Sequence, residues 1–442
     1  MFLLLLYIVQ TLNYASMLDV DRPWSDQFDV SATPYDLGKE APKKAEMDIL
    51  KDILKDPDNI ISNTFKIPNG LKDRVVFWAQ IYAIYPSTAV LIHDRDDLTV
   101  VYKAIDIDSV VPGKSDRGLT KEAIFRKKVA EERDSIKKIL RKISSVGGVK
   151  YFSSRIPEEK RIAKLVRSKM SNEESKSAYE NIRTQDGQKD NLIKGIKASS
   201  RYLPIIEDIF KENNLPWELT RLPFVESSFE IRAGSKVGAK GIWQIINKTG
   251  EKYLGTDPTY DERYSPFKAS AVAAEILKAD YKLLGTWPLA ITAYNHGPGG
   301  LKKAIKKLKT KDISKIVAEY ESDRFGFASQ NFYSEFLAAL YVTVYSEKLF
   351  GNIEKEHPMN FSYVTIEKDI DVNTLSKISG LNISEIQNYN PEFSKKILEG
   401  QIKLKTGSKI KLPPRASYKV EDYFIRSKDS NGGASVNVSI NN

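Results

Sequence analysis

The sequence predicts a mainly α-helical protein, with a small α/β module before its central helices and a short βααβ module after them. Three observations support this fold class. Apolar residues recur at helical spacing through most of residues 44–350, glycine or proline stands where several of these helices would end, and two short regions have the residue pattern of strands. With 442 residues, the chain has room for two to four domains.

The chain begins with a short apolar run. Residues 2–9 (FLLLLYIV) are followed by the small residues Ala15 and Ser16, a pattern typical of a secretory signal peptide over residues 1–16. The run is too short to cross a bilayer. No lysine or arginine precedes it, so an uncleaved anchor and a misplaced start codon are alternatives. Residues 17–43 are polar and are interpreted as a linker.

Residues 44–115 are expected to form the small α/β module, as an accessory unit. Two helices should begin it, and two strands joined by an acidic turn should complete it. The helices are expected at 44–56 and 73–85, and the strands at 89–93 and 98–102. His93, at a strand end, is interpreted as structural rather than as a metal ligand.

Residues 116–184 form a strongly charged helical segment. Helices are expected at 120–142, with Thr120 as N-cap, and at 158–170. Basic residues alternate with acidic ones there, which favours a solvated helix face over a surface that binds nucleic acid.

Residues 185–350 contain the central helices, expected at 191–213, 266–284, 287–293 and 325–350. Small residues in the second of these permit close packing, and Gly285 suits its end. Asp261-Glu262-Arg263 before it offers extra carboxylates, and a structural salt-bridged cap is an interpretation of at least equal weight.

Three polar groups of residues stand among these helices. The first is Glu226-Ser227, which follows an apolar stretch. An apolar setting disfavours the ionised carboxylate and raises its pKa, as a general acid needs. We expect Asn213 or Asn214 to cap a helix here, Pro223 to bend or end it near Glu226, and the helix dipole to add to the shift. The alternative is an exposed glutamate at a helix end.

The second and third groups surround turns. Gly238 and Gly241 allow a tight loop, and Gln244 beside Trp243 offers a neutral donor and acceptor. Tyr294 and Asn295 end an apolar helix at a Gly/Pro cluster, where His296 is interpreted as a turn residue. An ordinary turn and an ordinary helix cap are the alternatives.

Composition excludes several kinds of site. The chain has no cysteine, so disulfides, thiol catalysis, thiolate metal sites and a lipid anchor on cysteine are not expected. With only three histidines, a metal site is not expected either. The net charge of +10 favours polyanionic partners, although a lysine-rich proteome would give the same balance.

Residues 361–414 should form the βααβ module, with strands at 363–366 and 410–413 and helices at 372–378 and 383–389. The tail over residues 415–442, rich in Ser, Asn and Gly towards its end, is expected to be disordered.

The order Glu-Ser, G-x-x-G-x-W-Q and A-Y-N-x-G resembles the goose-lysozyme-like (SLT) catalytic domain of lytic murein transglycosylases, of the membrane-bound lytic transglycosylase D type. The likeness covers residues 185–350 well and 361–413 weakly, where it suggests a LysM-like module. There Asp371-Val372-Asn373-Thr374-Leu375 replaces the usual Gly-Asp-Thr-Leu. Many relatives also carry a Glu-Thr-x-x-Tyr-Val segment, where this chain has Phe332 at the tyrosine position and Tyr333 next to it.

The resemblance implies an enzyme that cleaves the β-1,4 bond between N-acetylmuramic acid and N-acetylglucosamine and leaves 1,6-anhydromuramic ends. It makes Glu226 the catalytic acid and base, and Ser227, Gln244, Tyr294 and Asn295 substrate-binding residues. No cofactor or metal is implied. Alternatives are a goose-type lysozyme, which hydrolyses the bond, and a non-catalytic wall-binding scaffold. Glycan strands of peptidoglycan are the expected partner, without nucleic acid, for a monomer exported to the periplasm or cell envelope.

Overall fold

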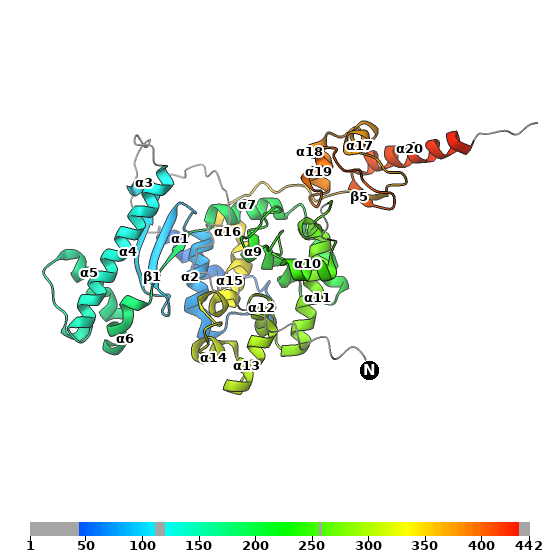
Figure 1. Cartoon of the computed structure of the whole chain (residues 1–442). Coiled ribbons are helices and arrows are strands. Elements are labelled where there is room, and N and C mark those ends of the chain that lie inside the picture. The colour runs from blue at the N-terminus through cyan, green and yellow to red at the C-terminus, as the bar shows by residue number, and fades with distance from the viewer. Residues whose placement is uncertain (1–43, 111–119, 256–258, 433–442) are drawn as a thin grey trace, which may run out of the picture.

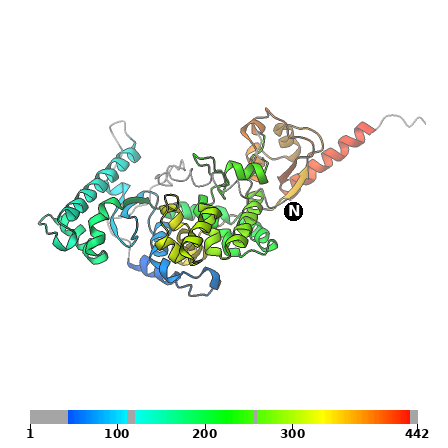
Figure 2. The same cartoon turned by 60° about the horizontal axis from the view of Figure 1, so that its bottom comes forward.

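The computed structural model describes residues 44–110, 120–255 and 259–432. The expected signal peptide (1–16) and linker (17–43) lie outside them. Helices dominate, as predicted. The charged helices lie at one end of the molecule and the C-terminal module at the other, with the central helices between them (Figures 1 and 2).

The first elements are helices α1 (Lys44–Ile53) and α2 (Lys72–Ala83) and a three-stranded antiparallel sheet of order β2-β1-β3. Strand β1 (Ala89–Asp94) pairs with β2 (Val101–Asp106) and with β3 (Ile182–Asp186). The second strand begins later than predicted because Asp94 to Val100 form a turn, in which the Asp94 amide donates to the Val100 carbonyl at 2.9 Å.

The charged segment folds onto this sheet. The short helix α3 (Ile107–Val110) precedes it, and its own helices are α4 (Lys121–Ser145), α5 (Pro157–Lys169) and α6 (Asn172–Ser177). Thr120 caps α4 as predicted, since its side chain accepts a hydrogen bond from the Ala123 amide. Helix α4 buries Phe125, Ile136 and Leu140, so it has an apolar face as well as the expected solvated one.

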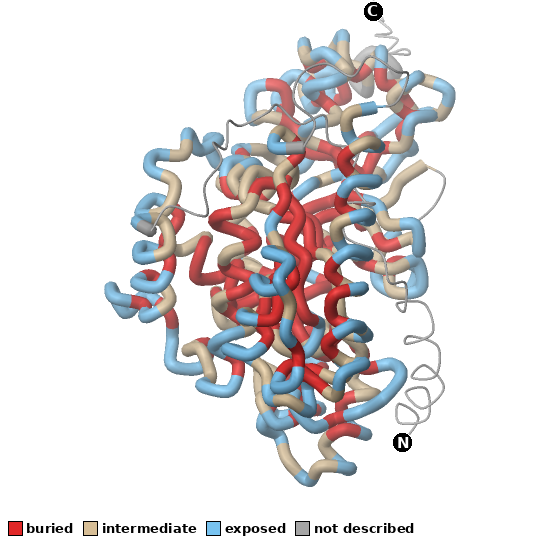
Figure 3. The backbone as a smooth tube through the Cα atoms, turned by 90° about the vertical axis from the view of Figure 1, so that its left-hand side faces the viewer, coloured by how far each residue is buried: buried red, intermediate tan, exposed pale blue. Residues whose placement is uncertain are grey.

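The hydrophobic cores divide the chain differently from the expected boundary at residue 115. Leu91 of β1 belongs to a core with α1, α2 and the central helices, whereas Val90 and Ile92 belong to a second core with α4 and α5. Strand β1 is buried along its whole length, and its two faces serve different cores. Buried residues run through the middle of the molecule, with exposed residues around them (Figure 3). Among the described residues, 44–110 therefore contribute to both of these cores.

The central helices surround the three polar groups. They are α7 (Lys189–Ser199), α8 (Leu203–Glu212), α9 (Leu222–Ser227), α10 (Asn247–Tyr253), α11 (Pro266–Leu284), α12 (Trp287–His296), α13 (Pro298–Leu308), α14 (Ile313–Glu319), α15 (Phe327–Val344) and α16 (Ser346–Phe350). The single helix predicted at 191–213 is wrong. It is interrupted between α7 and α8, where Pro204, in the first turn of α8, has no amide to continue the helix. Gly285 ends α11 in the left-handed conformation, as predicted.

The C-terminal module has its own core. Strands β4 (Ser362–Thr365) and β5 (Lys409–Leu412) pair antiparallel around α17 (Val372–Ser379), α18 (Ile383–Tyr389) and the short α19 (Lys395–Leu398). The expectation of a disordered tail from residue 415 is wrong for its first part. Helix α20 (Pro414–Gly432) packs Ala416, Val420 and Phe424 into this core because these apolar residues recur every four positions.

No helix in the described ranges has the length and apolar character that a membrane span requires.

Candidate active site

Glu226 lies in the last turn of the short helix α9. Pro223 begins this helix instead of ending a longer one, and the helix stops because Ser228 and Phe229 have φ angles of 48° and 60°. The predicted caps are also wrong, since Asn213 ends α8 and Asn214 has a φ of 58°. The alternative of an exposed glutamate does not hold, because Glu226 is only 7% exposed.

Burial raises the pKa of Glu226 to about 8, and the nearby Glu335 carboxylate adds to this shift. Among the described residues, neither carboxyl group has a hydrogen bond or an ion pair that would favour its charged form. Glu226 is therefore an acid that keeps its proton at neutral pH, as a general acid requires.

The glycine-rich loop lies directly beside this acid. Gly241 has a φ of 73°, and a Cβ there would lie 1.9 Å from the Arg263 carbonyl oxygen, so only glycine fits. Trp243 anchors the loop: it is buried, stacks on Phe210 at 5.5 Å and donates its ring N–H to the Ser270 hydroxyl at 2.7 Å.

Arg263 stabilises the loop from the opposite side. It is 4% exposed, forms an ion pair with Asp261 at 2.7 Å and donates to the Gly238 carbonyl at 2.9 Å. Asp261 also caps the short 3-10 helix Glu262–Tyr264. This confirms the interpretation of Asp261 and Arg263 as a salt-bridged cap.

Hydrogen bonds join the three polar groups through the backbone of the loop. The Ser227 hydroxyl donates to the Ile242 carbonyl at 3.0 Å, and the Tyr294 hydroxyl donates to the Trp243 carbonyl at 2.8 Å. Two successive carbonyl groups are thus held from α9 on one side and α12 on the other. The fold therefore brings together motifs that are far apart in sequence.

The remaining predicted residues are half-buried near this junction. The Gln244 amide donates to the Gly241 carbonyl within its own loop at 2.9 Å, and Gln244 has a φ of 45°. The Asn295 side-chain oxygen accepts a hydrogen bond from Ser329 of α15 at 3.0 Å. Ser227, by contrast, is 1% exposed and directs its hydroxyl to backbone carbonyls.

His296 is the last residue of α12 and is buried rather than exposed in a turn. Its Nδ1 lies 3.2 Å from the Ser329 hydroxyl, and burial lowers its pKa to about 4, so the ring is neutral at pH 7. In the parts of the chain that the structure describes, no three His, Asp or Glu side chains are grouped so that they could hold a metal ion.

Glu335 is the site residue that sequence reasoning missed. It is the single charged residue in the 18 residues of α15, and that isolated charge in an apolar helix was the available signal. Tyr333, the neighbour of the family tyrosine position, instead stacks on Phe336 with ring centres 6.2 Å apart and is 2% exposed.

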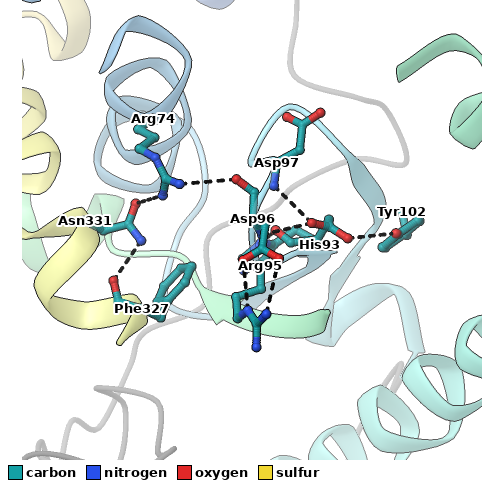
Figure 4. Close-up of polar contacts among 9 residues, drawn as sticks. Arg74, His93, Arg95, Asp96, Asp97, Tyr102, Phe327 and Asn331 are labelled. Carbon is teal, nitrogen blue, oxygen red and sulfur yellow. Dashed lines mark hydrogen bonds and ion pairs between the residues drawn. The ribbon is translucent and has the colours of Figure 1, made fainter. Parts of the chain in front are cut away.

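Asn331 links helix α15 to α2 by hydrogen bonds. The Asn331 side-chain oxygen accepts from Arg74 at 2.9 Å, and the Asn331 amide donates to the Phe327 carbonyl at 2.8 Å (Figure 4). The same oxygen also accepts from the Trp78 ring N–H at 3.3 Å. Glu335 lies one turn further along α15, on the same face as Asn331.

The site thus consists of a buried acid on a short helix, beside a glycine-rich loop that two hydroxyl groups hold, within a mainly helical domain. Residues 204–317 match the family of the transglycosylase SLT domain, and we identify this part of the chain as such a domain.

Two curated relatives are similar to this chain in sequence. Membrane-bound lytic murein transglycosylase D of Escherichia coli (strain K12) is 39% identical over 115 residues, which are 26% of this chain and 25% of the relative. A putative tributyltin chloride resistance protein of Alteromonas sp. (strain M-1) is 32% identical over 112 residues, 25% of this chain and 54% of the relative. The chain therefore matches about a quarter of the first relative's length and about half of the second's.

Proposed function

We propose that this protein is a lytic transglycosylase of peptidoglycan. It cleaves the β-1,4 bond between N-acetylmuramic acid and N-acetylglucosamine and leaves 1,6-anhydromuramic ends during cell-wall remodelling. The observation that carries this proposal is Glu226, a buried carboxylic acid in an SLT domain whose raised pKa keeps it protonated at neutral pH.

Glu226 serves first as acid and then as base. Its proton passes to the bridging oxygen as the bond from that oxygen to the anomeric carbon of the muramic sugar breaks. The resulting carboxylate takes the proton of the sugar's own C6 hydroxyl, whose oxygen bonds to the anomeric carbon. Glu226 thus regains the proton that it gave, and no water is consumed. The rate therefore depends on the positioning of the sugar and on proton transfer.

The other site residues act by position. Gln244, Tyr294 and Asn295 are half-buried beside the acid and offer amide and hydroxyl groups to the N-acetyl group and the C6 hydroxyl. Ser227 fixes the loop through the Ile242 carbonyl rather than touching the sugar, because its hydroxyl is buried.

The setting proposed for this activity is the periplasm or cell envelope, with the protein as a monomer on glycan strands. The net charge of +10 suits the peptide carboxylates of peptidoglycan. The C-terminal module is proposed to bind glycan in the manner of LysM.

Mass spectrometry of the sugar ends after digestion of purified peptidoglycan tests the proposal, with Glu226→Gln as the matched inactive variant. Anhydromuramic ends from the wild type, absent in the variant, are expected. Reducing ends would assign a lysozyme-like hydrolase instead. Binding without cleavage by the wild type would assign a wall-binding scaffold.

A further inference from the structure

One helix of the SLT domain, α13, exposes nothing but lysine. We call its four exposed residues the lysine face: Lys302, Lys303, Lys306 and Lys307. The apolar residues of the same helix belong to the protein core or pack against it. Seven of the fourteen residues 302–315 are lysines, whereas lysine and arginine together make up 68 of all 442 residues. The composition of the whole chain therefore does not explain this cluster.

The lysine face has no acidic partners. Among the residues that the structure describes, none of its four lysines forms an ion pair, and Lys307 lies over the Tyr320 ring at 5.6 Å instead. Asp312 is the single acid in the stretch 302–315, and it caps α14 by accepting from the Ser314 amide at 2.8 Å. The positive charge of the face is therefore available to an anion from outside the chain.

Helix stability does not account for the lysine face. Its members stand in two pairs four residues apart, and like charges at this spacing destabilise a helix. The helix dipole favours basic residues in the last turn, which explains Lys306 and Lys307 but not Lys302 and Lys303. Several basic residues of α4, by contrast, form ion pairs with acids.

The lysine face begins next to the proposed active site. Helix α12 carries Tyr294 and Asn295 near its end, and α13 starts at Pro298 and packs against α12. The two helices meet closely, because a Cβ on Gly300 would lie 2.2 Å from the His296 ring. At about 1.5 Å per residue, the four lysines lie about 6 to 14 Å from the start of α13 along its axis.

We propose that the lysine face binds the peptide stems of peptidoglycan through the carboxylates of those stems, while the glycan strand occupies the active site. The inference rests on the proposed function, because it adds a second contact for the same substrate. A stem of four residues spans up to about 14 Å when extended, which matches the distance of the lysines from the start of α13. Ammonium groups on flexible side chains suit carboxylates that are presented at variable positions.

A membrane surface fits α13 less well than peptide stems do. A helix that lies in a membrane interface exposes an apolar face beside its basic one. Helix α13 turns its apolar residues into the protein, and only lysines are exposed on it. It lies at the lower edge of the molecule in Figure 1 and the C-terminal module at the upper edge, so the two do not form one surface.

The test measures binding of the full chain to purified peptidoglycan sacculi by sedimentation. Glu226→Gln serves as the parent protein, so that the strands stay whole. The face variant adds glutamine at all four lysines of the face, and circular dichroism checks its fold. Its dissociation constant should be about tenfold higher than the parent's at low ionic strength, because four weak ion pairs are lost together. The difference should shrink at high salt, which screens exposed charges.

A matched variant removes the same net charge elsewhere. It carries glutamine at four exposed lysines of α4 and α5, namely Lys127, Lys138, Lys160 and Lys164. Its dissociation constant should stay within about twofold of the parent's, because isolated surface charges contribute little. An equal loss of affinity in this variant would assign the effect to net charge and overturn the inference.

Sacculi whose stems have been removed by an amidase test which part of the substrate is bound. They keep one carboxylate beside each muramic ring but lose those further out, so the face variant and its parent should bind them alike. An equal loss on these bare strands, or an unchanged affinity for intact sacculi, would overturn the inference. Vesicles of phosphatidylglycerol and phosphatidylcholine probe the membrane. Vesicle binding that needs the lysine face, with sacculus binding unchanged, would assign the face to lipid headgroups instead.

This inference and the proposed function fail separately, because binding needs no cleavage. A wild type that binds sacculi through the lysine face but cleaves nothing would refute only the proposed function. A wild type that leaves anhydromuramic ends, together with a face variant of unchanged affinity, would refute only this inference.

Discussion

At the scale of the residue, Glu226 combines a reactive group with a cost in stability. Its pKa rises from 4.5 to about 8 on folding, chiefly through burial. The folded protein therefore binds this proton more tightly than the unfolded chain does. Its contribution to stability is fully present below pH 4.5, is lost as the pH rises towards 8 and stays lost above that.

The substitution Glu226→Gln should remove this loss of stability at high pH. Below about pH 4.5 the variant and the wild type should have similar free energies of unfolding, because both side chains are neutral. Above pH 8 the variant should be more stable by about 2 to 4 kcal/mol, since it buries no charge. Urea unfolding at both pH values measures this, and equal stabilities at pH 8.5 would contradict it.

The sequence predicted Glu226 but not Glu335, for a physical reason. Glu226 lies beside apolar residues that are its neighbours in sequence, so its burial could be inferred locally. The effect of Glu335 on Glu226 depends on the packing of α15 against α9, which brings together residues 109 positions apart. Spacing within one helix does not report such a contact.

At the scale of the element, the loop from Gly238 to Ile245 connects α9 with α12, because both helices donate hydrogen bonds to its backbone. Its Ile242 and Trp243 carbonyls accept from Ser227 and Tyr294, and its shape depends on the positive φ of Gly241.

Gly241→Ala should therefore displace the loop and lose most of the activity. The new methyl group would meet the Arg263 carbonyl at 1.9 Å, and the backbone strain should cost about 2 to 3 kcal/mol or more. Gly407→Ala is a suitable control. Gly407 also has a positive φ, of 86°, but a Cβ there meets nothing within 4 Å, and it lies in the C-terminal module. Full activity in Gly241→Ala would contradict this view of the loop.

Local signals also explain which helices could be predicted. The helix at 266–284 has a proline at its start and Gly285 after its end, and the structure has α11 at those residues. The break between α7 and α8 was missed because apolar spacing continues across it, although Pro204 was a sign of it.

At the scale of the whole molecule, one hydrophobic core contains residues of α1, α2 and the central helices, which the sequence patterns had placed in separate domains. Trp78 of α2, which lies well before the SLT match in sequence, packs with Phe327 of α15, at 6.3 Å between ring centres. The elements before that match should therefore unfold together with the site.

Trp78→Ala tests this coupling. Loss of a side chain that is 3% exposed should cost about 3 to 5 kcal/mol and reduce activity. Phe424→Ala, also 3% exposed, should destabilise the C-terminal module alone. Hydrogen exchange followed by mass spectrometry should show faster exchange in α9 and α15 for the first variant only. Faster exchange restricted to α2 in that variant would contradict a shared core.

The central claim is that Glu226 directs the sugar's own hydroxyl, not water, to the anomeric carbon. The most direct measurement is digestion of peptidoglycan by the wild type in water enriched in oxygen-18, with mass spectrometry of the muramic ends. The account predicts anhydromuramic ends that contain no oxygen-18. Muramic ends that carry one oxygen-18 atom would contradict it and assign the site to hydrolysis.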